Sequence, residues 1–506
     1  MHMNIRTTSV FVQTINMLAF ANLEGRILDI SPAMATLATA ISTLVVIAVV
    51  KLFSVPRNLS HLPTVPLRPL LWSLLMRESE DERTRNVIIA FANAHGYPVV
   101  LVWTFGLWVV HIVDHKVIQI AWKDPAYIRQ HPSPDSLFWR FVGKHNILFT
   151  DGEEWKMHAK SVHAALQRPA PIAEFSAIAK RLVNSIKSHS GTTKCVAWDQ
   201  MAQRVTLDVL GSTILGYDFR AMEDPNSPFV NGYTKVVHSL TEPLYMFFPI
   251  LDKYFPRRVV EKEMQALREF FQRVLDQKRK NIGDDVISAM LQEPDMKDVD
   301  LIDNMVVLFI AGHDTTSSAL ASVIYYLAKY PEHQTRAREE VLSLFSGQQD
   351  LTADDIVKMP FVAACIKESM RMNDPSNITL TRAASTETNL AGYLIPPNTH
   401  LTYGIYASHH MERFWSDHSH YRPERFLENA SLNQLIVSAF SVGPRACPAK
   451  NFAMWELRTL LTIMLVEFEW SLPNETIHVD KLHNGFAFGI NINQPKDLDI
   501  YFRPRT

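Results

Sequence analysis

Residues 299–330 restrict how this chain can fold more than any other segment. They show helical periodicity, are apolar on nearly every face, and are followed directly by Pro331, which a helix does not run through. At about 1.5 Å per residue, such a helix would be more than ~40 Å long. Because a rod that is apolar all round cannot lie on a surface, we expect it to cross the middle of a large helical domain.

The overall composition fits one large ordered domain. The chain has 506 residues, 47% of them hydrophobic and 20% charged, with a formal net charge of -2. This balance leaves no global field to attract nucleic acid, so no nucleic-acid partner is expected. The three cysteines, Cys195, Cys365 and Cys447, are too few and too far apart for a disulfide framework or a Cys-x-x-Cys metal site. A reducing compartment is therefore favoured.

An apolar stretch near the N-terminus predicts a membrane anchor. No charged residue occurs between Asp29 and Lys51, and about 20 residues suffice to cross a bilayer core. A buried or interfacial helix is the alternative, because Pro32 and several Ser and Thr residues weaken the signal. A slight basic bias after the stretch places the main domain in the cytosol. We assign residues 1–29 to an N-terminal segment, 30–50 to a transmembrane anchor, 51–70 to a stiff proline-rich connector and 71–506 to the main domain.

Other segments predict further secondary structure. A second long helix should begin just after Cys447 and reach about Glu467. The apolar, aromatic residues 244–251 are expected to form a loop that acts as a lid or dips into the membrane, with burial in the core as the alternative. Strands are expected at residues 98–103, 107–113, 378–384 and 400–406.

The neighbours of Cys447 suit a metal-bound thiolate, although a lone cysteine is more often a small buried hydrophobe. Gly443 and Pro444 favour a tight turn whose N–H groups point at the sulfur. The helix that follows should turn its positive end toward the thiol and lower its pKa. Arg445 is placed to pair with a carboxylate, and Phe440 to shield the sulfur from water.

The spacing Phe-x-x-Gly-x-Arg-x-Cys in residues 440–447 resembles the haem-binding loop of the cytochrome P450 superfamily. A looser likeness is to its microsomal fungal members of secondary metabolism. One departure is Ala449, where the family usually has Gly. The resemblance implies a mainly α fold with a smaller β region. It also implies haem b, with Cys447 as the axial ligand of the iron and Phe440 and Arg445 as haem-binding residues.

A polar island at residues 311–316 interrupts the long apolar helix. Ordinary helix packing is one interpretation, with Gly312 allowing close approach and Thr315 bonded to the carbonyl of Ala311. The island also resembles the oxygen-activating groove of the family. That resemblance implies that Thr315 hydrogen-bonds dioxygen or a neighbouring water, and that Asp314 connects this place to solvent and delivers protons. His313 stands at a variable position and is interpreted as spacing only.

Two further motifs resemble those of the family. Glu368 and Arg371, an i,i+3 pair that is usually a weak surface contact, match its Glu-x-x-Arg, and Arg425 is the implied third member of a buried structural network.

Three other positions match family residues that bind haem propionates, namely Trp155, His158 and Arg382. The family's usual Arg near this Trp is replaced by Ala159. The candidates for that missing basic residue are His158, Lys156 and Lys160.

These matches imply a monooxygenase that inserts one oxygen atom from O2 into a lipophilic small molecule. No Gly-x-Gly-x-x-Gly or phosphate loop follows a strand, so the electrons should come from another protein. The resemblance implies that this partner is an NADPH-cytochrome P450 reductase, and we expect it to dock near Arg445 and Lys450. The expected location is the endoplasmic reticulum membrane, single-pass, with the catalytic domain in the cytosol. Two alternatives are a thiolate enzyme that rearranges peroxides, against which Asp314 and Thr315 argue, and an iron-free lipid or sterol carrier.

Overall fold

The computed structural model describes residues 32–104, 106–189, 194–240, 242–345, 350–428, 437–486 and 492–505. The chain divides into two compact units, Met1–Ser54 and Val55–Thr506. The described part of the first unit is helix α2 (Pro32–Phe53). The predicted segment 1–29 lies outside the described residues.

Among the described residues, two helices are long and apolar enough to cross a bilayer. They differ in how much of each is buried. The candidate span Thr39–Leu59 has a mean hydropathy of 2.0, and none of its 18-residue apolar window is buried. Helix α16 (Asp298–Lys329) is 78% buried over its apolar window, which identifies it as a core helix. The N-terminal helix is therefore the candidate membrane anchor.

Residues 55–66, which were expected to belong to a stiff connector, are part of the second unit, and two of them bond to its sheet. Val65 donates its N–H to the carbonyl of Leu101 at 2.9 Å, and Leu101 donates to Pro63 at 2.7 Å. A short 3-10 turn, η1 (Arg57–Leu59), precedes them. Helix α3 (Leu67–Leu75) then begins inside the predicted connector, because a proline in the first turn of a helix loses no hydrogen bond.

The larger sheet has five strands in the order β1-β2-β8-β5-β3. Only β2 and β8 run parallel, and the other neighbouring pairs are antiparallel. All four predicted strand regions contribute, although β5 is shorter than expected because Ile378 forms only an isolated bridge with Gly404. The strands are β1 (Val99–Thr104), β2 (Leu107–Ile112), β8 (His400–Tyr403), β5 (Arg382–Ala384) and β3 (Tyr127–Arg129).

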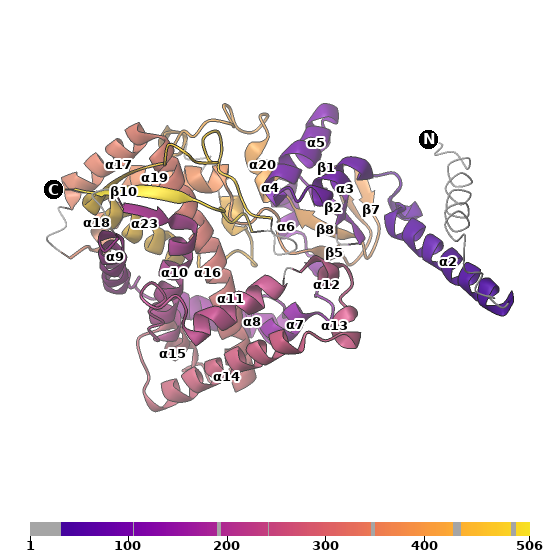
Figure 1. Ribbon diagram of the computed structural model, residues 1–506, viewed down its shortest axis with the longest axis horizontal. Coiled ribbons are helices and arrows are strands. Elements are labelled where there is room, and N and C mark those ends of the chain that lie inside the picture. Colours follow the sequence, from indigo (N-terminus) through magenta and orange to yellow (C-terminus); the bar gives the residue numbers. More distant parts are fainter. Residues whose placement is uncertain are drawn as a thin grey trace, which may run out of the picture. The chain divides into compact units, whose positions relative to one another are not determined.

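Helix α16 passes through the helical part of the second unit, beside the sheet-rich part (Figure 1). It packs against α10 (Trp198–Leu210), α14 (Arg258–Lys280), α19 (Pro360–Met372) and α23 (Lys450–Glu467). Its side chains are buried almost throughout, and the interruption falls at Ala311–Gly312 and Asp314–Thr315. Both long-helix predictions are confirmed, as is a mainly α fold with a smaller β region.

The remaining elements surround this core. The other helices are α4 (Glu80–Arg83), α5 (Ala90–His95), α6 (His115–Lys123), α7 (Leu137–Val142), α8 (Gly152–Leu166), α9 (Ile172–Lys187), α11 (Pro228–Leu240), α12 (Pro243–Phe247), α13 (Leu251–Tyr254), α15 (Val286–Met290), α17 (Pro331–Leu344), α18 (Ala353–Val357), α20 (Ile405–His410) and α21 (Arg425–Glu428). Wider π turns form η2 (Thr84–Ile89) and η3 (Gly211–Leu215), and η4 (Val437–Phe440) is a 3-10 turn. Strands β4 (Lys194–Ala197), β10 (Asp499–Pro504) and β9 (Phe468–Ser471) form a second sheet, and β6 (Thr388–Leu390) pairs with β7 (Tyr393–Ile395).

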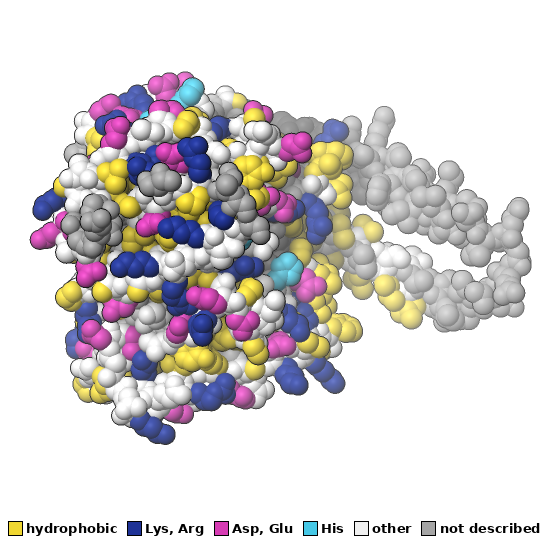
Figure 2. All heavy atoms as spheres, turned by 60° about the vertical axis from the view of Figure 1, so that its left-hand side comes forward, with side chains coloured by type: hydrophobic (Ala, Val, Ile, Leu, Met, Phe, Trp, Pro, Cys, Tyr) yellow, Lys and Arg dark blue, Asp and Glu magenta, His cyan; other side chains and the backbone are white. Residues whose placement is uncertain are grey.

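Residues 244–251 differ from the predicted loop, because they lie in and between the short helices α12 and α13. Leu244, Phe248 and Ile250 are about half exposed, so burial in the core is wrong for them. Elsewhere the surface is mixed: on the face in Figure 2, basic and acidic side chains alternate without a large region of one sign. The exposed apolar run therefore stands out as a surface feature.

Candidate active site

A cavity of about 360 Å³ lies against the polar island of α16. Ala311, Gly312 and Thr315 line it from that helix, and residues 439–441 and 444–449 line it from the loop before α23. A Cβ added to Gly312 would meet the side chain of Leu210 on α10 at 3.0 Å, so the glycine allows the two helices to approach closely. The two motifs that stand far apart in the chain therefore meet at one cavity.

Local backbone geometry presents Cys447 to this cavity. Its N–H donates to the carbonyl of Phe440 at 2.7 Å, and Ala446 donates to Gly443 at 3.1 Å. Gly443 has a φ of 79°, a left-handed conformation that favours glycine. The tight turn that the sequence predicted is thus formed, with Phe440 and Cys447 both on the cavity wall.

The thiol of Cys447 has a raised pKa, contrary to the expectation that a helix end would lower it. Burial is the largest cause, and it outweighs the N–H of Ala449 and the charge of Lys450, which both act to lower the pKa. The exposed surface of Cys447 faces the cavity. Protein surrounds the sulfur on its other sides. A thiolate at this position therefore needs a bound cation, and a coordinated metal deprotonates a thiol outright.

Three arginines converge at the same cavity: Arg129 on β3, Arg382 on β5 and Arg445 in the cysteine loop. Arg129 and Arg382 stand directly opposite each other on antiparallel strands, where like charges are destabilising. Burial, followed by the charges of Arg382 and Arg445, lowers the pKa of Arg129 to about 9. Among the described residues, the carboxylate that pairs with this cluster is Asp151, 2.6 Å from Arg445. The cluster thus has an excess of positive charge.

Several donors at the cavity have no hydrogen-bond partner among the residues that the structure describes. They are Nε of Arg129, Nε of Arg382 and Nε1 of Trp155. The guanidinium of Arg445 stacks over the ring of Trp155, with Cζ 4.2 Å from its centroid. An unsatisfied buried donor costs about 1–3 kcal/mol, so this set is suited to a ligand with more than one carboxylate. Together with the sulfur of Cys447, these donors fit a haem with its two propionates.

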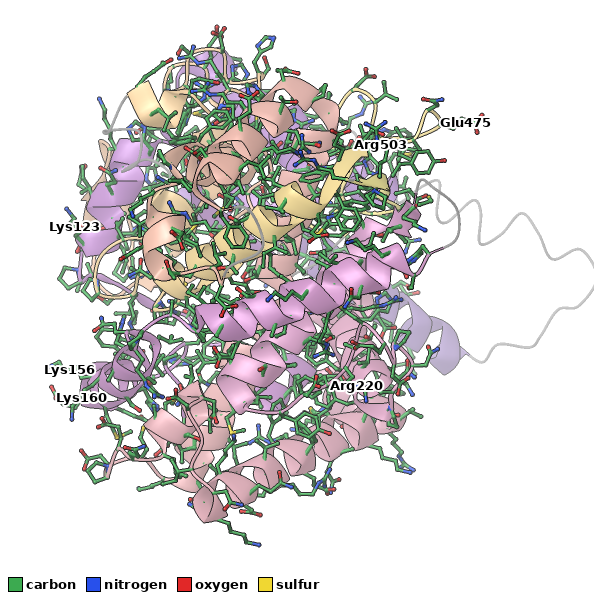
Figure 3. The ribbon with its side chains drawn as sticks, turned by 90° about the vertical axis from the view of Figure 1, so that its left-hand side faces the viewer. Lys123, Lys156, Lys160, Arg220, Glu475 and Arg503 are labelled. Atoms are coloured by element: carbon green, nitrogen blue, oxygen red, sulfur yellow. The ribbon has the colours of Figure 1, made fainter. Side chains whose placement is uncertain are left out.

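The structure corrects the expected basic residue near Trp155. His158 is completely buried, and its Nδ1 contacts the side-chain amide of Asn304 at 2.8 Å rather than lining the cavity. Lys156 and Lys160 are 64% and 71% exposed and point outward in Figure 3. Arg129 does line the cavity, and it brings a further positive charge to it. No motif marks it in the sequence, because only strand pairing brings it opposite Arg382.

The polar island of α16 has two sides. Thr315 lines the cavity, and its hydroxyl donates to the carbonyl of Ala311 at 2.7 Å. Asp314 turns instead toward His313, whose Nδ1 lies 2.8 Å from a carboxylate oxygen. His313 also contacts the carbonyl of Gln203 on α10 at 3.1 Å. Nothing in the sequence indicated these two contacts of His313, which was interpreted there as spacing rather than as a ligand.

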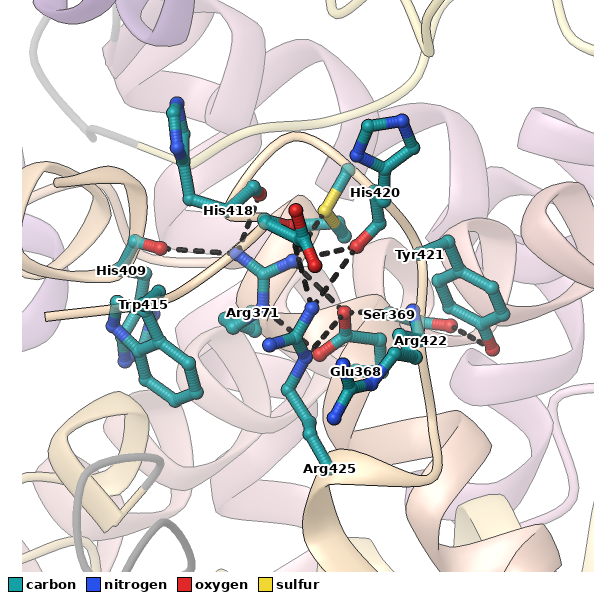
Figure 4. A network of polar contacts seen from close by, with 12 residues as sticks. Glu368, Ser369, Arg371, His409, Trp415, His418, His420, Tyr421, Arg422 and Arg425 are labelled. Carbon is teal, nitrogen blue, oxygen red and sulfur yellow. Dashed lines mark hydrogen bonds and ion pairs between the residues drawn. The ribbon is translucent and has the colours of Figure 1, made fainter. Parts of the chain in front are cut away.

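Glu368 lies at the centre of a buried polar network (Figure 4). Both of its oxygens accept from Arg371 at 2.8 Å, and one also accepts from Arg425 at 3.0 Å. The exposed side-chain fractions of these three residues are 0%, 0% and 2%. Arg371 also donates to the carbonyls of His409 and His418. The network ties α19 to the chain that leads toward Cys447.

Comparison with known proteins agrees with this geometry. The family model for cytochrome P450 matches residues 62–497. The chain belongs to the cytochrome P450 family. Its similar proteins include the ultra-long-chain fatty acid omega-hydroxylase of Homo sapiens, 25% identical over 374 residues, or 67% of this chain and 70% of that protein. Cytochrome P450 3A6 of Oryctolagus cuniculus is 23% identical over 66% of this chain and 71% of its own length. Geraniol 8-hydroxylase of Swertia mussotii is 26% identical over 63% of this chain and 65% of its own length.

Membership of the P450 family makes this chain a haem-thiolate monooxygenase with a redox partner. The cysteine loop, the arginine cluster and the α16 groove lie on one cavity, as that chemistry requires. An iron-free carrier, the alternative from a different class, is thereby set aside.

Proposed function

We propose that this P450 inserts one oxygen atom from O2 into a lipophilic small molecule, with electrons from NADPH delivered by a separate NADPH-cytochrome P450 reductase. The observation that carries the proposal is the position of Cys447 on the same cavity as Thr315 of α16. The second oxygen atom leaves as water. We further propose haem b as the cofactor, because the unpaired donors of Arg129, Arg382 and Trp155 suit its two propionates.

Each residue of the cavity has a defined task in this proposal. Bound haem supplies the iron and the redox chemistry, with the sulfur of Cys447 as its ligand. The N–H of Ala449 and the charge of Lys450 favour the thiolate form. Thr315 offers a hydroxyl to the cavity, and Asp314 next to it is the acid that exchanges protons with solvent. Glu368 and its arginines hold the protein frame rather than the reacting atoms.

The substrate class follows from the cavity wall. Leu210, Ile214, Val307 and Leu308 line it with aliphatic side chains, which favour an apolar ligand. Relatives named for a fatty acid and for geraniol agree with a lipophilic substrate. A role in secondary metabolism stays a prediction.

The proposed location is the endoplasmic reticulum membrane, with residues 30–50 as a single-pass anchor and residues 71–506 in the cytosol. The apolar helix α2 supports an anchor. The half-exposed Leu244, Phe248 and Ile250 support contact of the second unit with a lipid phase. For the reductase, Lys450 remains the basic contact, because Arg445 is engaged by Asp151.

The proposal is tested with the full chain in membranes. Cys447→Ser should lose the carbon monoxide spectrum of a ferrous haem thiolate and all NADPH-dependent oxygenation. Cys195→Ser changes an exposed cysteine on β4 and should leave both unchanged. A Cys447→Ser protein with an unaltered spectrum and full turnover would overturn the proposal.

A further inference from the structure

His313 lies in a closed polar site on the side of α16 away from the cavity. Its side chain is 5% exposed. Nε2 is 3.1 Å from the carbonyl oxygen of Gln203 on α10, and Nδ1 is 2.8 Å from Oδ1 of Asp314. From α11, the hydroxyl of Tyr233 stands 3.5 Å from Nδ1, and its ring meets the imidazole edge-on at 5.4 Å. Three elements therefore determine how this side chain is oriented.

The hydrogen-bond partners fix the number of protons in this site. A carbonyl oxygen only accepts, so Nε2 of His313 must carry a hydrogen. An ionised carboxylate also only accepts, so the 2.8 Å contact between Nδ1 and Asp314 needs a second hydrogen. A neutral imidazole facing an ionised Asp314 would bring two lone pairs together at hydrogen-bond distance. The hydroxyl of Tyr233, at 3.5 Å, is too distant to replace that hydrogen well.

The surroundings contain no competing charge for Asp314. Among the described residues, His313 is its ion-pair partner, and no Lys or Arg forms an ion pair with it. Burial, and then the charge of Asp314, raises the pKa of Tyr233 well above its usual value, so the phenol keeps its proton. The low dielectric of this site strengthens the remaining hydrogen bonds. The contact between His313 and Asp314 is thus the place in this site where the two side chains can share a proton.

We propose that His313 is a positioning residue for Asp314, and that the two share one proton which orients the carboxyl group next to Thr315 and is given up during turnover. After the proton leaves, Asp314 is a carboxylate and His313 a neutral imidazole with its hydrogen on Nε2. Solvent returns the proton at Asp314, whose side chain is 18% exposed. This inference rests on the proposed monooxygenase function and extends it to the source of the proton.

The proton count is tested directly on the full chain labelled with 15N-histidine and 13C-aspartate. The His313 signal, identified by its absence in His313→Gln, should show either both nitrogens protonated or a protonated Asp314 partner at neutral pH. In Asp314→Asn, whose amide needs no shared proton, His313 should become a neutral imidazole with hydrogen on Nε2. A neutral His313 beside an ionised Asp314 in the unsubstituted protein would overturn the inference.

A kinetic test asks whether the pair matters for turnover. With reductase and NADPH, His313→Gln should slow oxygen consumption on the order of tenfold and remove one limb of the pH profile. The control is His145→Gln, which breaks a histidine–carboxylate contact of the same 2.8 Å at a site about half exposed, and it should keep the profile. Identical pH profiles for the unsubstituted protein, His313→Gln and His145→Gln would refute the positioning role. Failure of the proposed monooxygenase function can be told apart from failure of this inference. It would remove the carbon monoxide spectrum, whereas the protonation of His313 and Asp314 could still be measured by NMR.

Discussion

Replacing Arg129 by Met should shift the stability of the apoprotein and the retention of haem in opposite directions. Arg129 faces Arg382 across two antiparallel strands, and burial together with its arginine neighbours lowers its pKa to about 9. Removing this charge relieves repulsion within the protein. It also removes a guanidinium whose Nε has no hydrogen-bond partner in the described part of the chain and which we assign to a haem propionate.

The size of both effects can be worked from the structure. A pKa lowered from 12.5 to about 9 corresponds to ~5 kcal/mol, and screening by water in the cavity reduces this to an expected gain of ~1–3 kcal/mol for the apoprotein. A charge-assisted hydrogen bond contributes about 1.5–3 kcal/mol. Haem should therefore dissociate ~10- to 150-fold faster from Arg129→Met.

The assay compares two measurements on the same variant. Urea midpoints followed by tryptophan fluorescence report the stability of the apoprotein, and transfer of haem to an excess of a haem-scavenging globin reports its retention. Arg503→Met removes a guanidinium that is 70% exposed and lies at the surface in Figure 3, so it should change neither. A less stable apoprotein, or haem release at the unsubstituted rate, would refute the assignment of Arg129.

Two further predictions concern stability. Glu368→Ala leaves Arg371 and Arg425 buried without their counter-charge and should lower stability by about 3–5 kcal/mol, seen as a lower urea midpoint and earlier haem loss. Glu153→Ala breaks an exposed i,i+3 pair and should cost less than ~1 kcal/mol; equal effects would contradict the network. Burial lowers the pKa of His111 to about 4, so as the pH falls below ~6.5 the unfolded chain takes up a proton first. The stability that this neutral histidine contributes above that pH, about 3 kcal/mol, should be lost between ~6.5 and ~4. In His111→Asn, the free energy of unfolding should therefore change less between these two pH values. An unchanged dependence of the unfolding free energy on pH would count against the reasoning.

Local rules explain why much of the fold was predictable from the sequence. Helix α16 ends where Pro331 begins the next helix, and its apolar character on all faces required burial. Strands β1 and β2 follow from dense β-branched and aromatic residues. The cysteine loop was equally visible, because a left-handed glycine and a fixed spacing before Cys447 are properties of contiguous residues.

Predictions failed where a residue's partners are far away in the chain. His158 has the right place near Trp155, but Asn304, 146 residues away, draws it into the protein. The sequence predicted a stiff connector over residues 51–70 but could not show that Pro63 and Val65 exchange hydrogen bonds with Leu101 of strand β1. The pKa of Cys447 was expected to follow its neighbouring helix end, yet burial by the whole fold outweighs that local effect.

By itself, the sequence determined the long helices, the main strands and the residues able to hold an iron through sulfur, since each depends on neighbours within a few positions. Only the tertiary structure decided that Arg129 faces Arg382 and that His313 lies between Asp314 and the carbonyl of Gln203 on α10. Hydrogen bonds and charges act over a few ångströms in space. Chain separation says nothing about that distance until strands are paired and helices are packed.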